Sequence, residues 1–198
     1  FSSATHTFSP SIKNNYINIR KFFKINKNQK IILVAMSSYD EVLSANLLYT
    51  NQPLGGIFKN QLEWIDNIVN HFKLKKNIFV IFRPHPREFL QGNFENEHAK
   101  ILKKIFLNLP NNMCANYPKD NISIYNIGME TSLLLNAWST AGEDLGMLGI
   151  PTITIGKDFT NYPTDIDYYS NNKKKYFEKI DKILKKDDWS FERIRNFY

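Results

Sequence analysis

The stretch Ile78-Phe-Val-Ile-Phe82, followed directly by Arg83-Pro84-His85-Pro86-Arg87-Glu88, is the most informative part of this sequence. The apolar run predicts a strand that is buried on both faces, as the strands of parallel sheets usually are. The polar residues begin where such a strand would end. In an open parallel α/β sheet, ligands bind in the crevice outside the carboxyl ends of the strands. His85, Arg83 and Arg87 are therefore candidate ligand-binding residues.

A second apolar run, at 131–137, is followed by Trp138-Ser139-Thr140-Ala141-Gly142-Glu143-Asp144. A helix is expected to begin here, and helix starts bind phosphate through their free amide groups and the helix dipole. Ser139 and Thr140 would add hydroxyl donors, and Gly142 would let a ligand approach the backbone closely. Glu143 or Asp144 would hold ribose hydroxyls, as acids do in dinucleotide folds. The two segments together predict a site for a phosphate-bearing nucleotide.

Both segments also have an ordinary structural interpretation. Thr140-Ala-Gly-Glu143 matches a capping box, which would satisfy the helix start without a ligand and leave Asp144 as the better ribose candidate. The prolines around His85 stiffen the chain, but they would equally serve to end a strand. Ser37-Ser38-Tyr39-Asp40-Glu41 follows a further apolar run, at 30–36. It would supply hydroxyls or an acid to the same crevice, or an N-cap and a first helical turn.

Apolar runs alternate with amphipathic segments along the chain. Strands are expected at 30–36, 78–82, 113–117, 131–137 and 153–155, and helices at 16–23, from Asn60 onward, before Pro110, and at 120–129, 142–148, 174–186 and 189–198. This alternation predicts an α/β fold, a Rossmann-like parallel sheet with helices on both faces. Residues 1–28 are expected to form a linker and short helix, and residues 29–198 the sheet domain. The buried helix positions expected are Leu62, Ile65, Ile68, Val69, Phe72, Ile101, Leu102, Ile105 and Phe106, with His71 and His98 facing solvent.

The composition excludes several classes of protein. The 198 residues, 42% hydrophobic and 23% charged, fit one domain or one lobe of a larger protein, and the start at Phe1 suggests a fragment or a processed product. No apolar run approaches the roughly 20 residues that span a bilayer. The net charge of +7 favours an anionic substrate or a membrane surface, whereas no aromatic-basic platform for nucleic acid is present. The single cysteine, Cys114, excludes an internal disulfide and is expected to be a small core residue.

Several sequence motifs are absent. There is no CxxC or HExxH pattern, so neither a metal nor a cofactor is expected. The absence of GxxxxGK[ST], GxGxxG and GxSxG argues against a P-loop enzyme, a dinucleotide oxidoreductase and an α/β-hydrolase.

The combination of the two segments resembles the C-terminal lobe of GT-B glycosyltransferases. The resemblance covers residues 30–157 and rests on residues 83–88 and 138–151. It is strongest to the bacterial capsule and surface-polysaccharide group that includes capsular Kdo transferases. The motif layout is also similar to that of bacterial sialyltransferases and teichoic-acid glycerophosphotransferases.

The resemblance implies roles for individual residues. His85-Pro86 would be the His-Pro pair, whose histidine contacts the donor phosphate and helps the nucleotide to leave. Ser139 and Thr140 would be the phosphate-binding pair, and Asp144 stands where a longer acid is usual, with Glu143 as an extra acid beside it. Which of the two acids meets the ribose stays open. The general base usually lies on the other lobe; on this one, Asp40 or Glu41 would supply a carboxylate.

The function implied is transfer of a sugar from a nucleotide donor, expected to be a CMP-sugar, to a polysaccharide or glycolipid acceptor. Ser37, Ser38, Arg83 and Arg87 would complete the donor site. An N-terminal GT-B lobe, a cytoplasmic location and peripheral association with the inner membrane face are expected, and nucleic acid is not an expected partner. Two alternatives remain: a glycerophosphotransferase-type polymer transferase, and a non-catalytic α/β lobe that binds a nucleotide.

Overall fold

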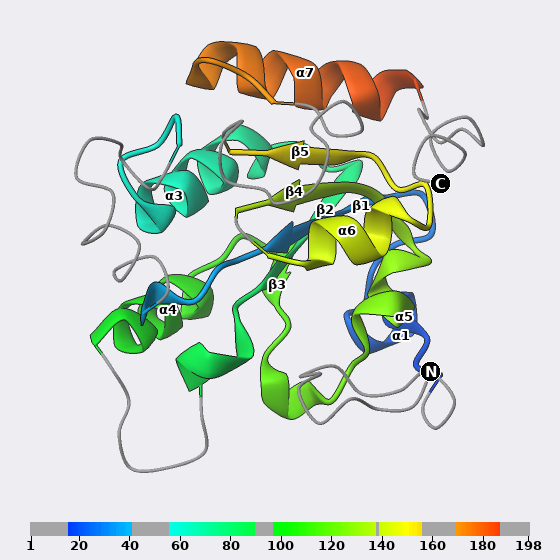
Figure 1. Cartoon of the computed structure of the whole chain (residues 1–198). Helices are drawn as coiled ribbons and strands as arrows, with labels where there is room; N and C mark the ends of the chain where they lie inside the picture. Colours follow the sequence, from blue (N-terminus) through cyan, green and yellow to red (C-terminus); the bar gives the residue numbers. More distant parts are fainter. Residues whose placement is uncertain (1–15, 41–55, 90–96, 138, 156–168, 187–198) are drawn as a thin grey trace.

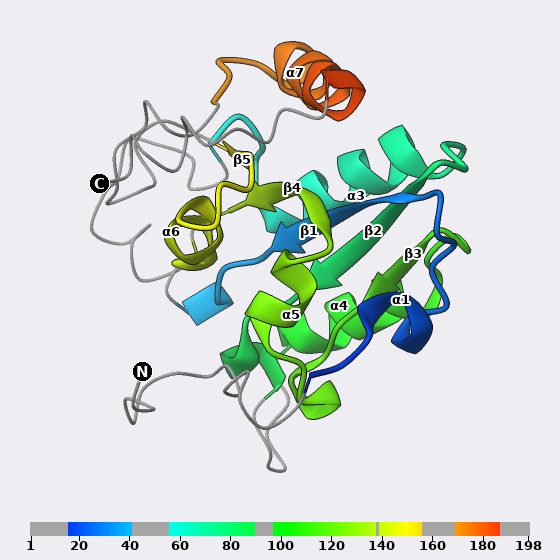
Figure 2. The ribbon, with the colours of Figure 1, turned by 90° about the vertical axis from the view of Figure 1, so that its right-hand side faces the viewer.

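A computed structural model of the chain describes residues 16–40, 56–89, 97–137, 139–155 and 169–186. They form one sheet of five parallel strands with helices on both faces (Figures 1 and 2), which confirms the α/β fold predicted from the sequence. The strands are β1 (Lys30–Ala35), β2 (Ile78–Arg83), β3 (Met113–Ala115), β4 (Thr131–Asn136) and β5 (Thr152–Thr154). Each lies where the sequence predicts a strand.

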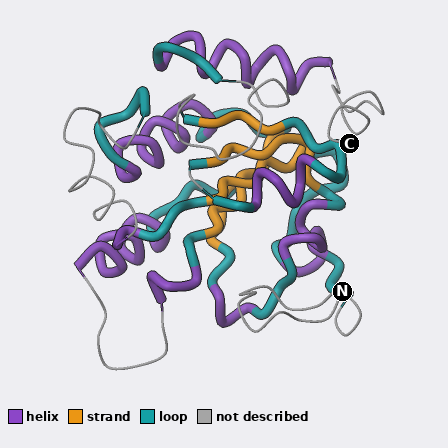
Figure 3. The backbone as a smooth tube through the Cα atoms, in the orientation of Figure 1, coloured by secondary structure: helices purple, strands orange, loops and turns teal. Residues whose placement is uncertain are grey.

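The strand order is β3-β2-β1-β4-β5, the order of Rossmann-type sheets. The chain moves from β1 to β2 and β3 on one side, and then returns to place β4 on the other side of β1. Figure 3 shows the strands side by side between the helices. The reversal creates a topological switch point between β1 and β4, which is where open α/β sheets bind their ligands.

The side chains of the central strand alternate between two apolar layers. Ile32 and Val34 of β1 pack under α3 (Gln61–Phe72), α4 (Glu97–Leu107) and α7 (Lys173–Lys186). Ile31 and Leu33 pack on the other face, under α1 (Ile19–Phe22), α5 (Ile124–Gly128) and α6 (Ala141–Gly146). Because helices cover both faces, nearly every strand position is apolar, and this explains the continuous runs in the sequence.

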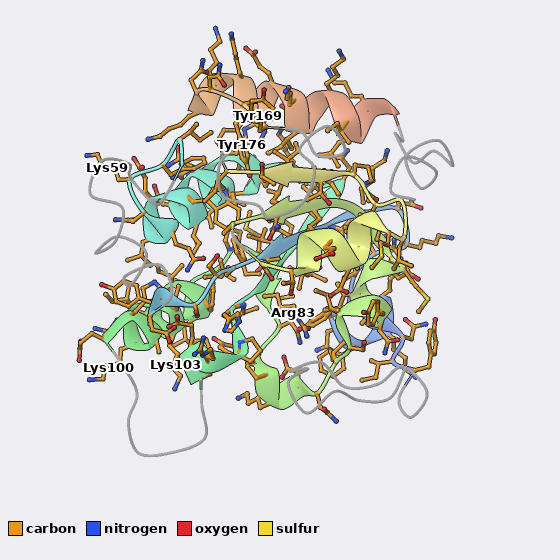
Figure 4. All side chains as sticks on the ribbon, in the orientation of Figure 1. Lys59, Arg83, Lys100, Lys103, Tyr169 and Tyr176 are labelled. Carbon is orange, nitrogen blue, oxygen red and sulfur yellow. The ribbon has the colours of Figure 1, made fainter. Side chains whose placement is uncertain are left out.

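Helix α3 begins where the sequence predicts. The Asn60 side chain accepts a hydrogen bond of 2.9 Å from the Glu63 N–H, which caps the helix. Its buried side chains include Trp64, whose burial the sequence analysis missed. The Trp64 Nε1–H donates to the Tyr176 hydroxyl at 3.1 Å, and Figure 4 shows Tyr176 on α7 above the sheet. This buried bond ties α7 to α3.

Three expectations about side chains on the helices are wrong. Ile101 is 40% exposed, because α4 turns His98, Ala99, Leu102 and Phe106 inward instead. His98 is buried, and His71 is half-buried with its Nε2 3.1 Å from the Asp181 Oδ1 of α7, so neither histidine simply faces solvent.

The single helix expected at 120–129 is two elements. A short 3-10 turn, η3 (Pro118–Asp120), ends at Asn121, which has a positive φ of 52°. Helix α5 then starts afresh after Ser123, whose Oγ accepts a hydrogen bond from the Tyr125 N–H. A left-handed residue cannot continue a right-handed helix, so the break is set at Asn121.

Cys114 lies in β3, where burial raises the pKa of its thiol to about 12. A protonated thiol is a poor nucleophile, which fits the predicted structural role. In the described part of the chain, no helix is long and apolar enough to cross a membrane. The expected linker before Tyr16, the helix expected at 189–198 and Trp138 lie outside the described residues.

Candidate functional site

Three predicted segments meet at one edge of the sheet. Ser37-Ser38 follows β1, Pro84-His85 follows β2 and Ser139-Thr140 follows β4. The strands are parallel, so these ends share an edge, on the left in Figure 1. Since β1 lies between β2 and β4, the serine pair is flanked by the other two segments. The switch point lies between the serine pair and Ser139-Thr140.

The two serines after β1 are buried, with 1% and 0% of Ser37 and Ser38 exposed. Neither Oγ has a hydrogen-bond partner within the described ranges. The Gln61 side chain fixes the backbone of Ser37, accepting from its N–H at 2.8 Å and donating to its carbonyl at 3.1 Å. Buried hydroxyls without partners are uncommon and cost free energy. This end of β1 is therefore suited to a polar ligand.

The turn after β4 is held by Asn136. Its Nδ2 donates to the Ser139 carbonyl at 2.9 Å, and its Oδ1 accepts from the Ser139 N–H at 3.2 Å. The Ser139 Oγ accepts from the Ala141 N–H at 3.2 Å. Thr140 is exposed, has a helical backbone and makes no side-chain cap, so the alternative capping box is not formed. Both hydroxyls keep a hydrogen to donate.

The two acids of α6 have different surroundings. Glu143 is exposed, and its side chain makes no hydrogen bond or ion pair with any residue that the structure describes. Asp144 is half-buried and accepts a hydrogen bond of 3.1 Å from the Tyr125 hydroxyl of α5. Burial raises the pKa of Asp144, and the bond from Tyr125 opposes that rise. Gly142 is buried in the first turn of the helix. Glu143 is thus the acid more open to a ligand.

His85 lies in a turn between β2 and a 3-10 helix, η2 (Pro86–Phe89). Its Nδ1 accepts a hydrogen bond of 3.3 Å from the Arg87 N–H, and its carbonyl accepts one of 3.0 Å from the Glu88 N–H. A ring nitrogen that accepts carries no proton, so a neutral His85 carries its proton on Nε2. A donor of this kind suits a phosphate oxygen.

The structure separates the two arginines of the predicted site. The Arg83 guanidinium donates to the Asn116 Oδ1 and to the Ile122 carbonyl, beside the segment that follows β3 (Figure 4). Burial lowers the pKa of Arg83 to about 10, an effect that Asp120 opposes, so the group stays charged at neutral pH. These contacts give Arg83 a structural role in joining β2 to the segment after β3.

Arg87 and Asp40 are both exposed. The Arg87 Nη2 lies 3.6 Å from the Asp40 Oδ2, an ion pair that joins the segment after β2 to the segment after β1. Exposed pairs of this kind contribute little to stability, about 0–1 kcal/mol. Both groups nevertheless lie at the sheet edge where the sequence predicts them.

Glu88, to which no motif in the sequence assigns a role, is buried at this edge. Its Oε1 accepts from the Tyr39 N–H, and its Oε2 lies 3.1 Å from the His98 Nδ1. The Tyr39 and His98 rings stack with centroids 4.6 Å apart. The only signal in the sequence is the position of Glu88, three residues after the proline-flanked histidine. Nothing in the sequence points to His98.

Among the residues described, no three His, Cys, Asp or Glu side chains gather as they would around a metal ion. A cavity of about 350 Å³ lies between α3 and α4, lined by Asp66, Val69, Lys104, Ile105, Asn108 and Leu109. None of the predicted site residues lines it, so it is separate from the sheet edge.

No protein-family model matches the sequence, and no curated protein sequence matches it. Solved structures do match. A UDP-GlcNAc 2-epimerase from Neisseria meningitidis, bound to UDP-GlcNAc, is 14% identical with a TM-score of 0.56, over 88% of this chain and 42% of its own. The spinosyn rhamnosyltransferase SpnG, complexed with thymidine diphosphate, is 11% identical with a TM-score of 0.56, over 86% and 41%. The wall teichoic acid polymerase TagF is 15% identical with a TM-score of 0.54, over 91% and 41%.

The chain has the fold of one GT-B lobe. It spans less than half the length of each of these structures. At such low identities the likeness concerns the fold alone. Within this GT-B lobe, the three polar segments occupy the edge of the sheet at which Rossmann-like folds bind ligands.

Proposed function

We propose that this GT-B lobe binds the nucleotide part of an activated sugar, as part of a glycosyltransferase that builds a bacterial capsule or other surface polysaccharide. A CMP-sugar is the proposed donor, and a polysaccharide or glycolipid the proposed acceptor. One observation carries the proposal: the segments after β1, β2 and β4 meet at one sheet edge around the switch point. Two proteins of the same fold, the epimerase and SpnG, hold UDP-GlcNAc and thymidine diphosphate.

In this proposal the site stabilises the departing nucleotide. Negative charge builds on the phosphate as the bond to the sugar breaks, and preorganised donors lower the energy of that state. The Nε2–H of His85 donates from one side, and the hydroxyls of Ser139 and Thr140 donate from the start of α6. Arg87 adds positive charge at the rim. Ser37 and Ser38 keep their proposed place at the end of β1, where a ligand would have to displace the residues that bury their hydroxyls.

The acids and Arg83 take different parts in the proposal. Glu143 holds the ribose, because its carboxylate is exposed while Asp144 is bonded to Tyr125. Asp40 is the proposed general base on this lobe. Arg83 contributes to the fold and not to donor binding, because it fixes the segment after β3 through Asn116 and Ile122.

Two other functions would use the same sheet edge. The likeness to TagF favours a polymer transferase of the glycerophosphotransferase type, with a different donor and the same His-Pro turn. A non-catalytic lobe would bind the nucleotide without turnover. Both alternative functions predict that the lobe binds a nucleotide. The nucleotide that binds best therefore distinguishes a CMP-sugar donor from the donor of a glycerophosphotransferase.

The proposal is tested by calorimetric titration of the chain with CMP, CDP, UMP and UDP. We expect CMP to bind best, and His85→Ala to weaken it about tenfold or more, the scale of a lost hydrogen bond to a charged group. His71→Ala is the matched control, because His71 contacts α7 and lies outside the three segments. A preference for CDP would move the assignment to a glycerophosphotransferase-type donor, and one for UDP to a UDP-sugar. Equal CMP binding by wild type and His85→Ala would contradict the proposed site.

A further inference from the structure

Glu88 joins three parts of the chain at the candidate site. The Tyr39 N–H donates to its Oε1, and Tyr39 directly follows the buried pair Ser37-Ser38. His98, in the first turn of α4, lies 3.1 Å from its Oε2. The backbone of Glu88 belongs to η2. One carboxylate therefore connects the end of β1, the turn after β2 and the start of α4.

This connection is buried and satisfied on both oxygens. The side chains of Glu88 and His98 are only 2% and 5% exposed. An ionised carboxylate can only accept, so the His98 Nδ1–H is the donor. The Tyr39 ring stacks on the His98 ring with an interplanar angle of 14°, which covers the pair. A satisfied buried network of this kind fixes the relative position of the elements that it joins.

The same turn sets the position of His85. The Glu88 N–H donates to the His85 carbonyl at 3.0 Å, and the Arg87 N–H donates to the His85 Nδ1 at 3.3 Å. The side chain of Glu88 holds Tyr39, while its backbone holds His85. Glu88 therefore links the His85 turn to the segment that follows Ser37 and Ser38.

We propose that Glu88, held by His98, is a positioning residue for the donor site. It fixes the His85 turn against the segment that follows β1, so that the His85 Nε2–H is held in place for a phosphate at this edge of the sheet. The inference rests on the proposed function for its ligand. Its structural part rests on two sets of contacts: the Glu88 carboxylate holds Tyr39 and His98, and the Glu88 backbone N–H holds the His85 carbonyl.

The chain contains a matched control pair away from the site. His71 of α3 lies 3.1 Å from Asp181 of α7, and its ring stacks on Phe177 with centroids 4.4 Å apart. This pair also sets a histidine against a carboxylate and a ring, and it joins two helices on one face of the sheet. It differs in that the Lys75 Nζ lies 2.5 Å from the Asp181 Oδ1 and 2.8 Å from the His71 Nε2. The His71–Asp181 pair is more exposed than the His98–Glu88 pair, so its removal should cost less stability. All variants are therefore compared under conditions in which each is fully folded.

The first test needs no nucleotide. We would record the ¹⁵N shifts of the His85 ring in wild type, Glu88→Ala, Glu88→Gln and Asp181→Ala. Wild type should show the proton on Nε2, and Glu88→Ala should shift both nitrogens towards averaged values as the turn loosens. Glu88→Gln should restore the wild-type signals, because its amide oxygen accepts from Tyr39 and its NH₂ donates to the His98 Nδ1, with the His98 proton moved to Nε2. Asp181→Ala should leave them unchanged.

The second test is titration of the same proteins with CMP. Glu88→Ala should bind about tenfold more weakly or worse, the scale of one lost charged hydrogen bond, while Glu88→Gln and Asp181→Ala stay within about twofold of wild type. A folded Glu88→Ala protein with unchanged His85 shifts and CMP affinity overturns the inference. If wild type binds no nucleotide, the proposed function fails, while the His85 shifts still decide the positioning role.

A further variant covers the case in which Glu88→Ala does not fold. His98→Phe keeps a ring against Tyr39 and removes only the bond to the Glu88 Oε2. It should produce the same change in the His85 shifts in a folded protein. Wild-type shifts in His98→Phe would contradict a positioning role for the pair.

Discussion

The Tyr125 hydroxyl donates a hydrogen bond of 3.1 Å to Asp144, which joins α5 to α6 on one face of the sheet. Asp144 is half-buried, and burial raises the pKa of its carboxyl above the ordinary value in spite of this bond. The folded state therefore binds more protons than the unfolded state between the two pKa values. Stability falls as the pH rises from the unfolded pKa through the folded one.

Replacing Asp144 by Asn should remove this pH dependence. The amide oxygen of the new side chain keeps an acceptor for Tyr125, so packing is preserved. The free energy of unfolding of Asp144→Asn, relative to wild type, should increase as the pH rises from the ordinary aspartate pKa through the raised pKa of the folded state. Urea unfolding at several pH values measures this. Tyr125→Phe should steepen the wild-type slope, since it removes the bond that lowers the pKa. Parallel stability curves for wild type and Asp144→Asn would contradict the assignment.

The bond between Trp64 and Tyr176 should contribute measurably to stability. Tyr176→Phe leaves the Trp64 Nε1–H buried without an acceptor, which should cost about 1–3 kcal/mol. Urea unfolding followed by circular dichroism gives the difference. Tyr16→Phe is the control, because Tyr16 is 70% exposed and should change stability by less than about 0.5 kcal/mol. Equal stability of the two variants would show that the Trp64 bond contributes nothing.

Replacing Arg83 should lower the stability of the fold, whereas replacing Arg87 should lower the affinity for CMP. Arg83→Met leaves the Asn116 side chain and the Ile122 carbonyl without their donor, and should destabilise the fold by about 1–3 kcal/mol. Its CMP affinity, measured where it is folded, should match wild type. Arg87→Met should do the reverse, because Arg87 is exposed and its loss should weaken CMP binding most at low salt. Loss of CMP binding in folded Arg83→Met would instead indicate that Arg83 binds the phosphate.

Gly149 closes the segment after α6 with a φ of 77°. A side chain in this left-handed conformation costs about 1–2 kcal/mol, so Gly149→Ala should lower the free energy of unfolding by that amount. Thermal or urea unfolding checks it. An unchanged stability would mean that the backbone relaxes at this position.

The sheet could be predicted from the sequence because its strands are buried on both faces. Ile31 and Ile32 pack into different layers, and both must be apolar, so the run is visible without knowledge of the partners. The polar segments after three strands were found for a related reason. Parallel strands place their carboxyl ends together, so a polar stretch after each apolar run is enough to indicate a shared edge.

The remaining features depend on contacts between distant segments. His98 is buried against Glu88 of another element, which accepts its hydrogen bond, whereas Ile101 of the same helix is 40% exposed. The pattern Thr140 to Glu143 matches a capping box. The cap does not form, because Asn136 fixes the turn at Ser139 and Thr140 is already helical. Hydrophobic periodicity and short motifs describe only residues close together in the sequence, so they cannot predict these contacts between distant segments.

The strand order has a consequence for the newly made chain. Ile32 lies opposite Val80 and also opposite Leu133, about 100 residues further along, so β1 gains its second neighbour late in synthesis. Until Thr131–Asn136 emerges from the ribosome, the centre of the finished sheet is an unpaired apolar edge, and such edges recruit other chains into aggregates. A chain whose translation stops before β4 would therefore be prone to aggregate and would lack part of the candidate site. When β4 pairs with β1, it covers that edge and brings Ser139 and Thr140 to the same edge of the sheet as Ser37 and Ser38.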